Sequence, residues 1–415
     1  MRLFNTMTQH VEDFVAPTDG PVRLYVCGVT PYDTAHLGHA FVYATFDTLV
    51  RTLQAQGHTV DYTENVTDID DPLFAKAKEL GNITWDELAR RETERFLHEM
   101  GAINVAMPNH YVRASDELPT MFAMIAQLLA NGHAYVSDGW IYFDHTSDPS
   151  YGQLAEAAGF HGYAALLAEA NEHGNVPDDP RKRDPLDFML WRGETPGEPS
   201  WPSPFGPGRP GWHIECSAMS TRYLGPQLDI HGGGRDLIFP HHSSEIAQAE
   251  NASGQRPFVR VWMHTGMVAL GGTKMSKSLG NLIIVGKLLE TNTPDAIRLL
   301  LARHHYRSDW DYFPDDMATA QTLADRLLAA ADAGEMVPRP LPAGVLWQMR
   351  TEQPAIDEFL TAMEDDLDTP RAVATLDALA RDLLAGTFSA AEGMVTRQAL
   401  RAAASLLGLR LRRAE

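Results

Sequence analysis

The chain has 415 residues and carries 34 basic against 55 acidic side chains, for a formal net charge of −21. Hydrophobic residues make up 44% and charged residues 21%, which is typical of a globular protein and excludes the disordered and fibrous classes. This length predicts two or three domains. The negative charge means that any nucleic-acid partner must meet a local basic patch and not a generally basic surface.

No apolar run reaches the roughly 18 residues that a membrane-spanning helix needs, and the first residues carry acids where a signal peptide needs an apolar stretch. We therefore expect a cytoplasmic protein with no membrane partner. The only cysteines, Cys27 and Cys216, lie far apart, which excludes a disulfide scaffold and a CxxC zinc knuckle. Lysine is also scarce, yet Lys274 and Lys277 fall within one pentapeptide.

The first part of the chain predicts a βαβ unit followed by two amphipathic helices. The expected elements are a strand over Val22–Val26, a turn at Cys27-Gly28, a helix over 39–53, a strand over 60–65, and helices over 84–100 and 116–131. Thr84 stands where the N-cap of its helix is expected. In such a unit, ligands collect beyond the carboxyl ends of the parallel strands.

The middle of the chain, from about residue 132 to 210, is rich in Gly, Pro and Asp and predicts an insertion with a β-hairpin near 140–143. Strands are expected again at 228–230 and 259–268. After about residue 294 we expect only helices, at 317–331, 354–366, 371–384 and 397–407.

These elements predict an α/β fold: a Rossmann-like, doubly wound parallel sheet with an insertion, followed by a C-terminal α-helical bundle. The expected domains are 1–130 for the first half of the catalytic domain, 131–210 for the insertion, 211–315 for the second half with the lysine loop, and 316–415 for the bundle.

The tetrapeptide His36-Leu-Gly-His39 lies between the first strand and the first helix. Two imidazoles at a helix N-terminus suit the phosphates of a nucleotide, because backbone amides and the helix dipole face the anion. Two surface histidines beside a turn explain the tetrapeptide equally well.

The pentapeptide Lys274-Met-Ser-Lys-Ser278 lies in a glycine-flanked loop. Two ammonium groups on a mobile loop can follow the charge of a triphosphate as it builds in a transition state. The alternative is a solvated basic loop, which the scarcity of lysine elsewhere disfavours.

A third candidate region begins at His231-Gly-Gly-Gly-Arg-Asp236. Gly232, Gly233 and Gly234 would let the backbone approach a nucleoside, and Asp236 would accept hydrogen bonds from ribose hydroxyls. His241 and Glu245 follow at i and i+4, which is metal-ligand spacing on a helix, although such pairs are usually just solvated.

Together, the histidine and lysine motifs resemble the paired signatures of class I aminoacyl-tRNA synthetases, which join an amino-acid carboxylate to AMP. The wider sequence looks like cysteinyl-tRNA synthetase and its close relatives, over the stretches VRLYVCGVTPYD, ENVTDIDD, KRDPLDFMLW, GRPGWHIECSAM, DIHGGGRDLIFPHHSSEIAQAE, KMSKSLGN and HHYRSDW. The resemblance implies an ATP-dependent ligase with Mg²⁺.

The resemblance also implies one zinc ion per chain, held by Cys27, Cys216, His241 and Glu245. A substrate thiol can ligate zinc as a thiolate, whereas a serine hydroxyl cannot do so competitively, so the metal would select cysteine. The alternative for each cysteine is a small buried apolar residue.

The remaining roles are likewise implied by the resemblance. Thr30, Thr67 and Trp212 match positions around the bound L-cysteine, with turn closure and core packing as their alternative roles. His36 and His39 would steady the phosphates of ATP. Lys274 and Lys277, chiefly the latter, would stabilise the departing pyrophosphate.

Two acceptors are compatible with this activation chemistry: tRNA(Cys), as in cysteine–tRNA ligases, and the amine of glucosaminyl-inositol, as in the mycothiol-pathway ligase. The sugar is favoured by the sequences of several short segments and by the lack of a small anticodon-binding domain after the bundle. The tRNA is favoured by Glu245, by the sequence of residues 172–177 and by the universal need to charge tRNA. We expect tRNA first and the sugar as the alternative; a non-catalytic cysteine sensor comes third because both signatures are intact.

Overall fold

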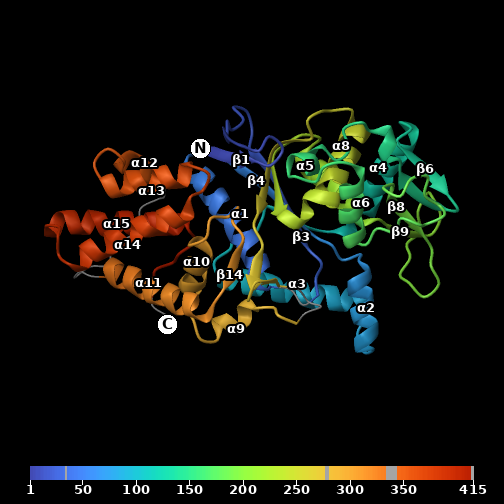
Figure 1. Ribbon diagram of the computed structural model, residues 1–415. Coiled ribbons are helices and arrows are strands. Elements are labelled where there is room, and N and C mark those ends of the chain that lie inside the picture. The colour runs from blue at the N-terminus through green and yellow to red at the C-terminus, as the bar shows by residue number, and fades with distance from the viewer. Residues whose placement is uncertain (33–34, 276–279, 333–343, 413–415) are drawn as a thin grey trace.

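The computed structural model describes residues 1–32, 35–275, 280–332 and 344–412. Its centre is a five-stranded sheet in the order β11-β10-β3-β4-β5, with every neighbouring pair parallel (Figure 1). These strands are β3 (Val22–Val29), β4 (Val60–Val66), β5 (His110–Arg113), β10 (Leu228–Gly234) and β11 (Val259–Thr265). The order reverses between β3 and β10, which is the topological switch point of a doubly wound sheet. The predicted fold class is confirmed.

Helices cover both faces of the sheet, as the apolar runs in its strands require. One face packs against α1 (Leu37–Ala55), α3 (Trp85–Ala102) and α10 (Pro294–Ala302). The other packs against α4 (Leu118–Ala130), α7 (Trp212–Leu224) and α8 (Ser243–Ser253). Thr84 caps α3 in a capping box with Glu87, as its position in the sequence predicts.

The insertion forms a separate antiparallel sheet in the order β6-β7-β8-β9, which lies to the right of the central sheet in Figure 1. Its strands are β6 (Ala134–Ser137), β7 (Trp140–Phe143), β8 (Phe188–Gly193) and β9 (Gly208–Pro210), and α5 (Gln153–Ala157) and α6 (Tyr163–Glu172) lie between β7 and β8 in the chain. The predicted hairpin is confirmed as β6–β7.

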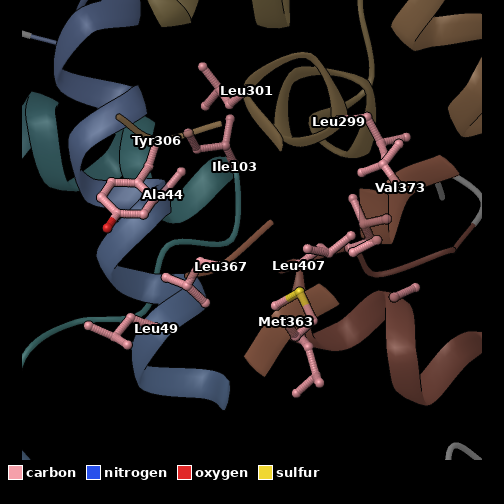
Figure 2. Packing of buried hydrophobic residues seen from close by; sticks show 14 of the residues in the cluster. Ala44, Leu49, Ile103, Leu299, Leu301, Tyr306, Met363, Leu367, Val373 and Leu407 are labelled. Carbon is pink, nitrogen blue, oxygen red and sulfur yellow. The ribbon is translucent and has the colours of Figure 1, made fainter. Parts of the chain in front are cut away.

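The C-terminal helices pack directly on α1 and α10. They are α11 (Pro314–Asp332), α12 (Val345–Met349), α13 (Pro354–Glu364), α14 (Thr369–Leu384) and α15 (Ala390–Leu406). Their buried residues belong to the same apolar cluster as those of α1 and α10. Figure 2 shows some of its members, among them Ala44 and Leu49 of α1, Leu299 of α10, and Met363 and Val373 of the bundle. None of the described helices is both long and apolar enough to cross a bilayer. The division of the chain at 130, 210 and 315 stays our proposal for its domains.

Two sequence expectations about strands are wrong. The strand expected over 259–268 is split at Gly266 into β11 and β12 (Val268–Leu270), because the Gly266 N–H donates to the Tyr306 carbonyl at 2.7 Å and β12 pairs with β14 instead of β10. The region after 294 is not wholly helical, since β14 (Trp310–Tyr312) pairs in parallel with β12. A three-residue strand is too short to show periodicity, and its pairing partner is distant in the chain.

The small elements complete the fold around this core. A hairpin of β1 (Arg2–Asn5) and β2 (His10–Asp13) opens the chain, α2 (Asp71–Leu80) follows β4, β13 (Thr273–Lys274) pairs with β12, and α9 (Val285–Leu289) precedes α10.

Substituting Gly232 with alanine should destabilise the protein by about 1–3 kcal/mol. A Cβ at this position of β10 would lie 2.0 Å from the ring of Phe46, which is fully buried on α1, so the ring or the strand must shift. Urea unfolding measures the effect. Gly101→Ala in α3 is the control, because its Cβ would meet no atom within 4 Å; it should stabilise by about 0.5–1 kcal/mol. Equal midpoints for Gly232→Ala and the wild type would contradict the packing argument.

Candidate active site

A cleft of about 270 Å³ lies at the switch point, between the carboxyl ends of β3 and β10 and the start of α1. We call it the switch-point cleft. Of the residues singled out from the sequence, it is lined by Cys27, Thr30, His36, His39, Gly234 and Asp236. Gly232 and Gly233 do not line it. Added Cβ atoms there would meet Phe46 and Leu237, so the small size of these two glycines serves packing.

The histidine motif forms the amino end of α1. His36 is the N-cap, and its Nδ1 accepts a hydrogen bond from the Gly38 N–H at 3.1 Å. The rings of His36 and His39 stack with their centroids 3.8 Å apart. Since both side chains line the cleft, the positive end of a 19-residue helix and two imidazoles face the same space. This arrangement suits a phosphate group.

The segment after the lysine loop is hydrogen-bonded to the histidine motif. The Leu37 N–H donates to the Ile283 carbonyl at 2.8 Å, and the Val285 N–H donates to the Ala35 carbonyl at 2.9 Å. Met275, the residue after Lys274, lines the cleft. The backbone of Lys274 lies in β13, but its side chain and the whole of Lys277 lie outside what the structure describes. The described residues on either side of the lysine motif, Met275 and 283–285, therefore lie beside the histidine motif.

The structure brings together Cys27, Cys216, His241 and Glu245. Their ligand atoms all lie within 4.8 Å of one another, and none of the four residues is more than 4% exposed. Cys27 Sγ is 3.4 Å from Glu245 Oε1, and His241 Nε2 is 3.2 Å from the same oxygen. Cys27 comes from β3, Cys216 from α7 and Glu245 from α8, while His241 lies in the turn just before α8. We call these residues the Cys₂HisGlu cluster.

The electrostatics of the cluster fit a bound cation. Burial, together with the nearby Cys216 and Glu245, raises the pKa of the Cys27 thiol well above its ordinary value. Burial also lowers the pKa of His241, which favours the neutral imidazole that a metal requires. His241 Nε2 faces the Glu245 carboxylate without making a hydrogen bond among the described residues, while its Nδ1 lies 2.9 Å from Nδ1 of His213. Two sulfurs, one imidazole nitrogen and one carboxylate oxygen form a donor set suited to Zn²⁺.

Two further histidines at the cluster were not singled out from the sequence. His231 Nε2 lies 3.1 Å from Glu245 Oε2, and His242 bonds through Nδ1 to His264 Nε2 at 2.7 Å. With Cys27 and Glu245, they form a second group with metal-ligand spacing. Because this group shares Cys27 and Glu245 with the first, we interpret His231, which contacts the Glu245 carboxylate, as a support that orients it. The only signal in the sequence was their presence in the DIHGGGRD and FPHH segments.

Asn65 organises the site and was also missed. Its side-chain oxygen accepts hydrogen bonds from the Gly28 N–H at 2.8 Å and the Tyr25 hydroxyl at 3.0 Å, and lies 3.6 Å from Cys216 Sγ. A Cβ at Gly28 would lie 1.5 Å from the Asn65 carbonyl oxygen, which explains the glycine after Cys27. One buried amide thus ties β3 and β4 to α7.

The three residues expected around a bound amino acid lie in different surroundings. Thr30 lines the cleft, and its hydroxyl donates to Asp70 Oδ2 at 2.8 Å. Thr67 is buried, and its hydroxyl accepts from the Asn65 amide at 3.2 Å. Trp212 stacks on the His241 ring with centroids 4.2 Å apart. Trp212 thus contacts the cluster directly, whereas Thr67 contacts Asn65, whose side-chain oxygen lies near Cys216.

Replacing Glu64 with glutamine should flatten the pH dependence of stability above pH 5. Burial raises the pKa of Glu64 to about 8, opposed by the hydrogen bond from the Tyr62 hydroxyl. A carboxyl group whose pKa is raised in the folded state stabilises that state when the pH is below the ordinary glutamate pKa. This contribution is lost as the pH rises towards 8. The free energy of unfolding of the wild type, relative to Glu64→Gln, should therefore fall by up to about 1.4 kcal/mol per pH unit. Parallel pH profiles of the two proteins would refute the shift.

Comparison with known proteins reveals close relatives. The family model described as the tRNA synthetases class I (C) catalytic domain matches residues 13–322. The L-cysteine:1D-myo-inositol 2-amino-2-deoxy-alpha-D-glucopyranoside ligase of Parafrankia sp. (strain EAN1pec) is 46% identical over 88% of this chain and 79% of its own length. The protein of the same name from Streptosporangium roseum is 44% identical over 93% and 90%. The Cysteine--tRNA ligase of Dehalococcoides mccartyi is 40% identical over 99% and 86%.

Solved structures agree on the fold. A Mycobacterium tuberculosis methionyl-tRNA synthetase in complex with methionyl-adenylate superposes with a TM-score of 0.61 at 17% identity, covering 93% of this chain and 90% of that one. At this identity the likeness concerns the fold alone.

Proposed function

The chain belongs to the class I (C) tRNA synthetase family and is a ligase, and from this premise we propose that it activates L-cysteine with ATP and transfers it to the amine of glucosaminyl-inositol. The observation that carries the activation step is the buried Cys₂HisGlu cluster beside the switch-point cleft. Cys27 belongs to both, so a thiol bound at the cluster lies next to a space fit for a nucleotide.

In this proposal the cluster selects the substrate. Cys27, Cys216, His241 and Glu245 would hold a zinc ion, and Trp212 covers the His241 side. When bound, zinc would supply a Lewis acid to which a cysteine side chain can bind as a thiolate. Serine is rejected because its hydroxyl cannot make the same bond, which is discrimination by a lost contact and not by size.

The cleft residues carry out the activation. An oxygen of the cysteine carboxylate attacks the α-phosphorus of ATP, the bond to the β-phosphate breaks, and pyrophosphate leaves. His36 and His39 donate to the phosphate oxygens as charge builds on them. Asp236 binds the ribose hydroxyls, and the lysine motif stabilises the pyrophosphate. Mg²⁺, when bound, would supply further positive charge there. Transfer follows when the acceptor amine attacks the carbonyl carbon: the C–N bond forms, the bond to AMP breaks, and the amine proton passes to solvent.

Support for the sugar acceptor comes from the relatives. Proteins named as ligases of cysteine with the glucosaminyl-inositol compound match 88–93% of this chain at 42–46% identity. This similarity favours the sugar acceptor, which the sequence predicts as the alternative, over tRNA, which is its first choice. Transfer to tRNA(Cys) stays the second candidate, because the Dehalococcoides relative covers 99% of the chain at 40% identity and because Glu245 lies at the cluster.

The test is to offer the purified protein ATP, L-cysteine and either glucosaminyl-inositol or total tRNA. We expect AMP release and a cysteinyl amide with the sugar, and no cysteine attached to tRNA beyond the level without enzyme. Charged tRNA without the sugar product would replace this proposal with the second candidate. Absence of cysteine-dependent ATP–pyrophosphate exchange would refute both.

A further inference from the structure

A second cavity, of about 190 Å³, lies between the insertion and the start of α7. Its walls include Trp140, Tyr142, Val176, Lys182, Phe188 and Trp212. We call it the insertion cavity. It is smaller than the roughly 300–1,000 Å³ of a pocket that encloses a whole drug-sized ligand, so it has room for only part of one. None of the residues that line the switch-point cleft lines it.

The walls combine aromatic rings with a few polar groups, the composition typical of a small-molecule site. Lys182 Nζ donates to the Asn175 side-chain oxygen and to the Pro185 carbonyl, the latter at 3.3 Å. Both acceptors are neutral, and an ammonium group has three donors. His173, also in the wall, bonds through Nδ1 to the Glu169 carbonyl at 3.0 Å. Such groups suit hydroxyls.

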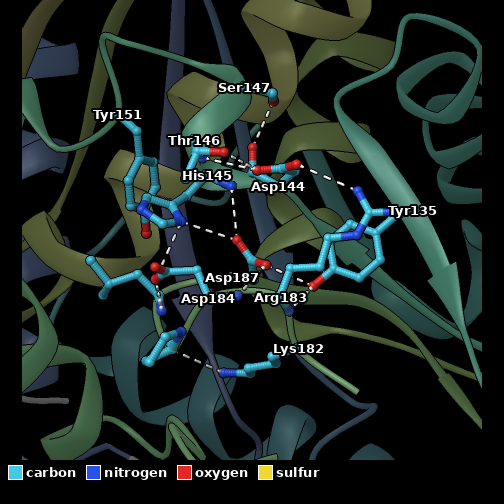
Figure 3. A network of polar contacts seen from close by, with 12 residues as sticks. Tyr135, Asp144, His145, Thr146, Ser147, Tyr151, Lys182, Arg183, Asp184 and Asp187 are labelled. Atoms are coloured by element: carbon cyan, nitrogen blue, oxygen red, sulfur yellow. Dashed lines mark hydrogen bonds and ion pairs between the residues drawn. The ribbon is translucent and has the colours of Figure 1, made fainter. Parts of the chain in front are cut away.

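A network of polar contacts fixes the segment that carries Lys182. Asp187 accepts from the Tyr135 hydroxyl at 2.6 Å and lies 3.0 Å from His145 Nδ1 (Figure 3). Its Oδ2 also accepts from the Asp184 N–H at 3.0 Å. Asp187 is fully buried, so the loop that supplies Lys182 is anchored to β6. The cavity wall is therefore preorganised, which lowers the entropic cost of binding.

Trp212 connects the insertion cavity to the catalytic site. It lines the cavity, and its ring stacks on that of the cluster residue His241 at 4.2 Å. A ring bound in the cavity is thus one aromatic side chain away from cysteine held at the cluster.

We propose that the insertion cavity binds the polyhydroxylated ring of the acceptor that lacks the reacting amine. This inference rests on the proposed function. In glucosaminyl-inositol, that ring is the inositol, which would pack against the aromatic walls and receive hydrogen bonds from Lys182 and His173. The glucosamine ring then passes Trp212 towards the activated carbonyl.

Val176→Trp tests the assignment, because Val176 is 59% exposed and a large ring there fills the mouth of the cavity without repacking the core. Val136→Trp is the matched control: Val136 is 61% exposed on β6 in the same insertion and does not line the cavity. We expect Val176→Trp to raise the KM for glucosaminyl-inositol at least tenfold, with ATP–pyrophosphate exchange unchanged within twofold. Val136→Trp should change neither.

A second pair of variants removes a charge without adding bulk. Lys182→Met should raise the same KM, whereas Lys287→Met, at an exposed lysine paired with Glu290 on α9, should not. With free glucosamine as the acceptor, all four variants should match the wild type, since the cavity would stay empty.

The outcomes are distinct. If the wild type makes the sugar product and Val176→Trp and Lys182→Met leave KM unchanged, the proposed function stands and the cavity assignment is wrong. A parallel loss of pyrophosphate exchange in these variants also overturns it. If the wild type makes no sugar product but charges tRNA, the proposed function fails, and with it the inositol as the occupant.

Discussion

Replacing Cys216 with serine should lower cysteine-dependent ATP–pyrophosphate exchange by at least about 1,000-fold, on the order of the discrimination that a lost strong contact provides. Cys216 is 1% exposed, and its sulfur is one of four ligand atoms that lie within 4.8 Å of one another. A serine hydroxyl is a poor zinc ligand at neutral pH, so the variant should also lose the metal.

Two measurements on the same preparation separate metal loss from misfolding: the zinc content per chain and the unfolding midpoint. Ser220→Ala serves as the matched control, because Ser220 is also buried on α7 and its hydroxyl donates to the Ser217 carbonyl; it should keep both zinc and exchange. Treating the wild type with a chelator should abolish exchange, and added Zn²⁺ should restore it. Full exchange by Cys216→Ser would refute selection of cysteine by a metal.

Replacing His39 with alanine should lower kcat for pyrophosphate exchange about 100- to 1,000-fold, the usual cost of losing one donor to developing charge. His39 lines the cleft at the first turn of α1 and stacks on His36. Since neither histidine belongs to the Cys₂HisGlu cluster, the KM for cysteine and the zinc content should not change.

His36→Ala is a less clean test, because His36 also caps α1 through the Gly38 N–H. Its loss should lower the unfolding midpoint as well as kcat, since removal of an N-cap costs about 0.5–2 kcal/mol. His58→Ala, at an exposed histidine before β4, is the control and should match the wild type. An unchanged kcat for His39→Ala would remove the histidine motif from the catalytic machinery.

Local patterns in the sequence were sufficient for the elements around the site. The β-rich run at Val22 and the apolar spacing after His39 predict β3 and α1, and the Thr84 cap marks the start of α3. These features depend on neighbours a few residues away, so they can be read from sequence alone. The spacing of one ligand pair is equally local: His241 and Glu245 are one turn apart, and their nearest side-chain atoms lie 3.2 Å from each other.

The contacts that assemble the cluster from separate elements are not local. Cys27 and Cys216 come from β3 and α7, and Asn65 of β4 lies between them with bonds to Gly28 and Tyr25. The motifs of the family indicated which residues meet, but no spacing in the chain indicated how they meet. The contact of His231 with Glu245 and that of His242 with His264 were missed for the same reason.

The sequence by itself determined the α/β class, the order of the main elements and the family, because periodicity, caps and motifs are properties of short stretches. Only the tertiary structure decided that β14 pairs with β12, that Gly232 faces Phe46, and that the insertion encloses a cavity behind Trp212. Each of these depends on which distant segments the parallel sheet brings side by side. That choice is set by packing and strand pairing across the whole chain, and no single stretch of sequence contains it.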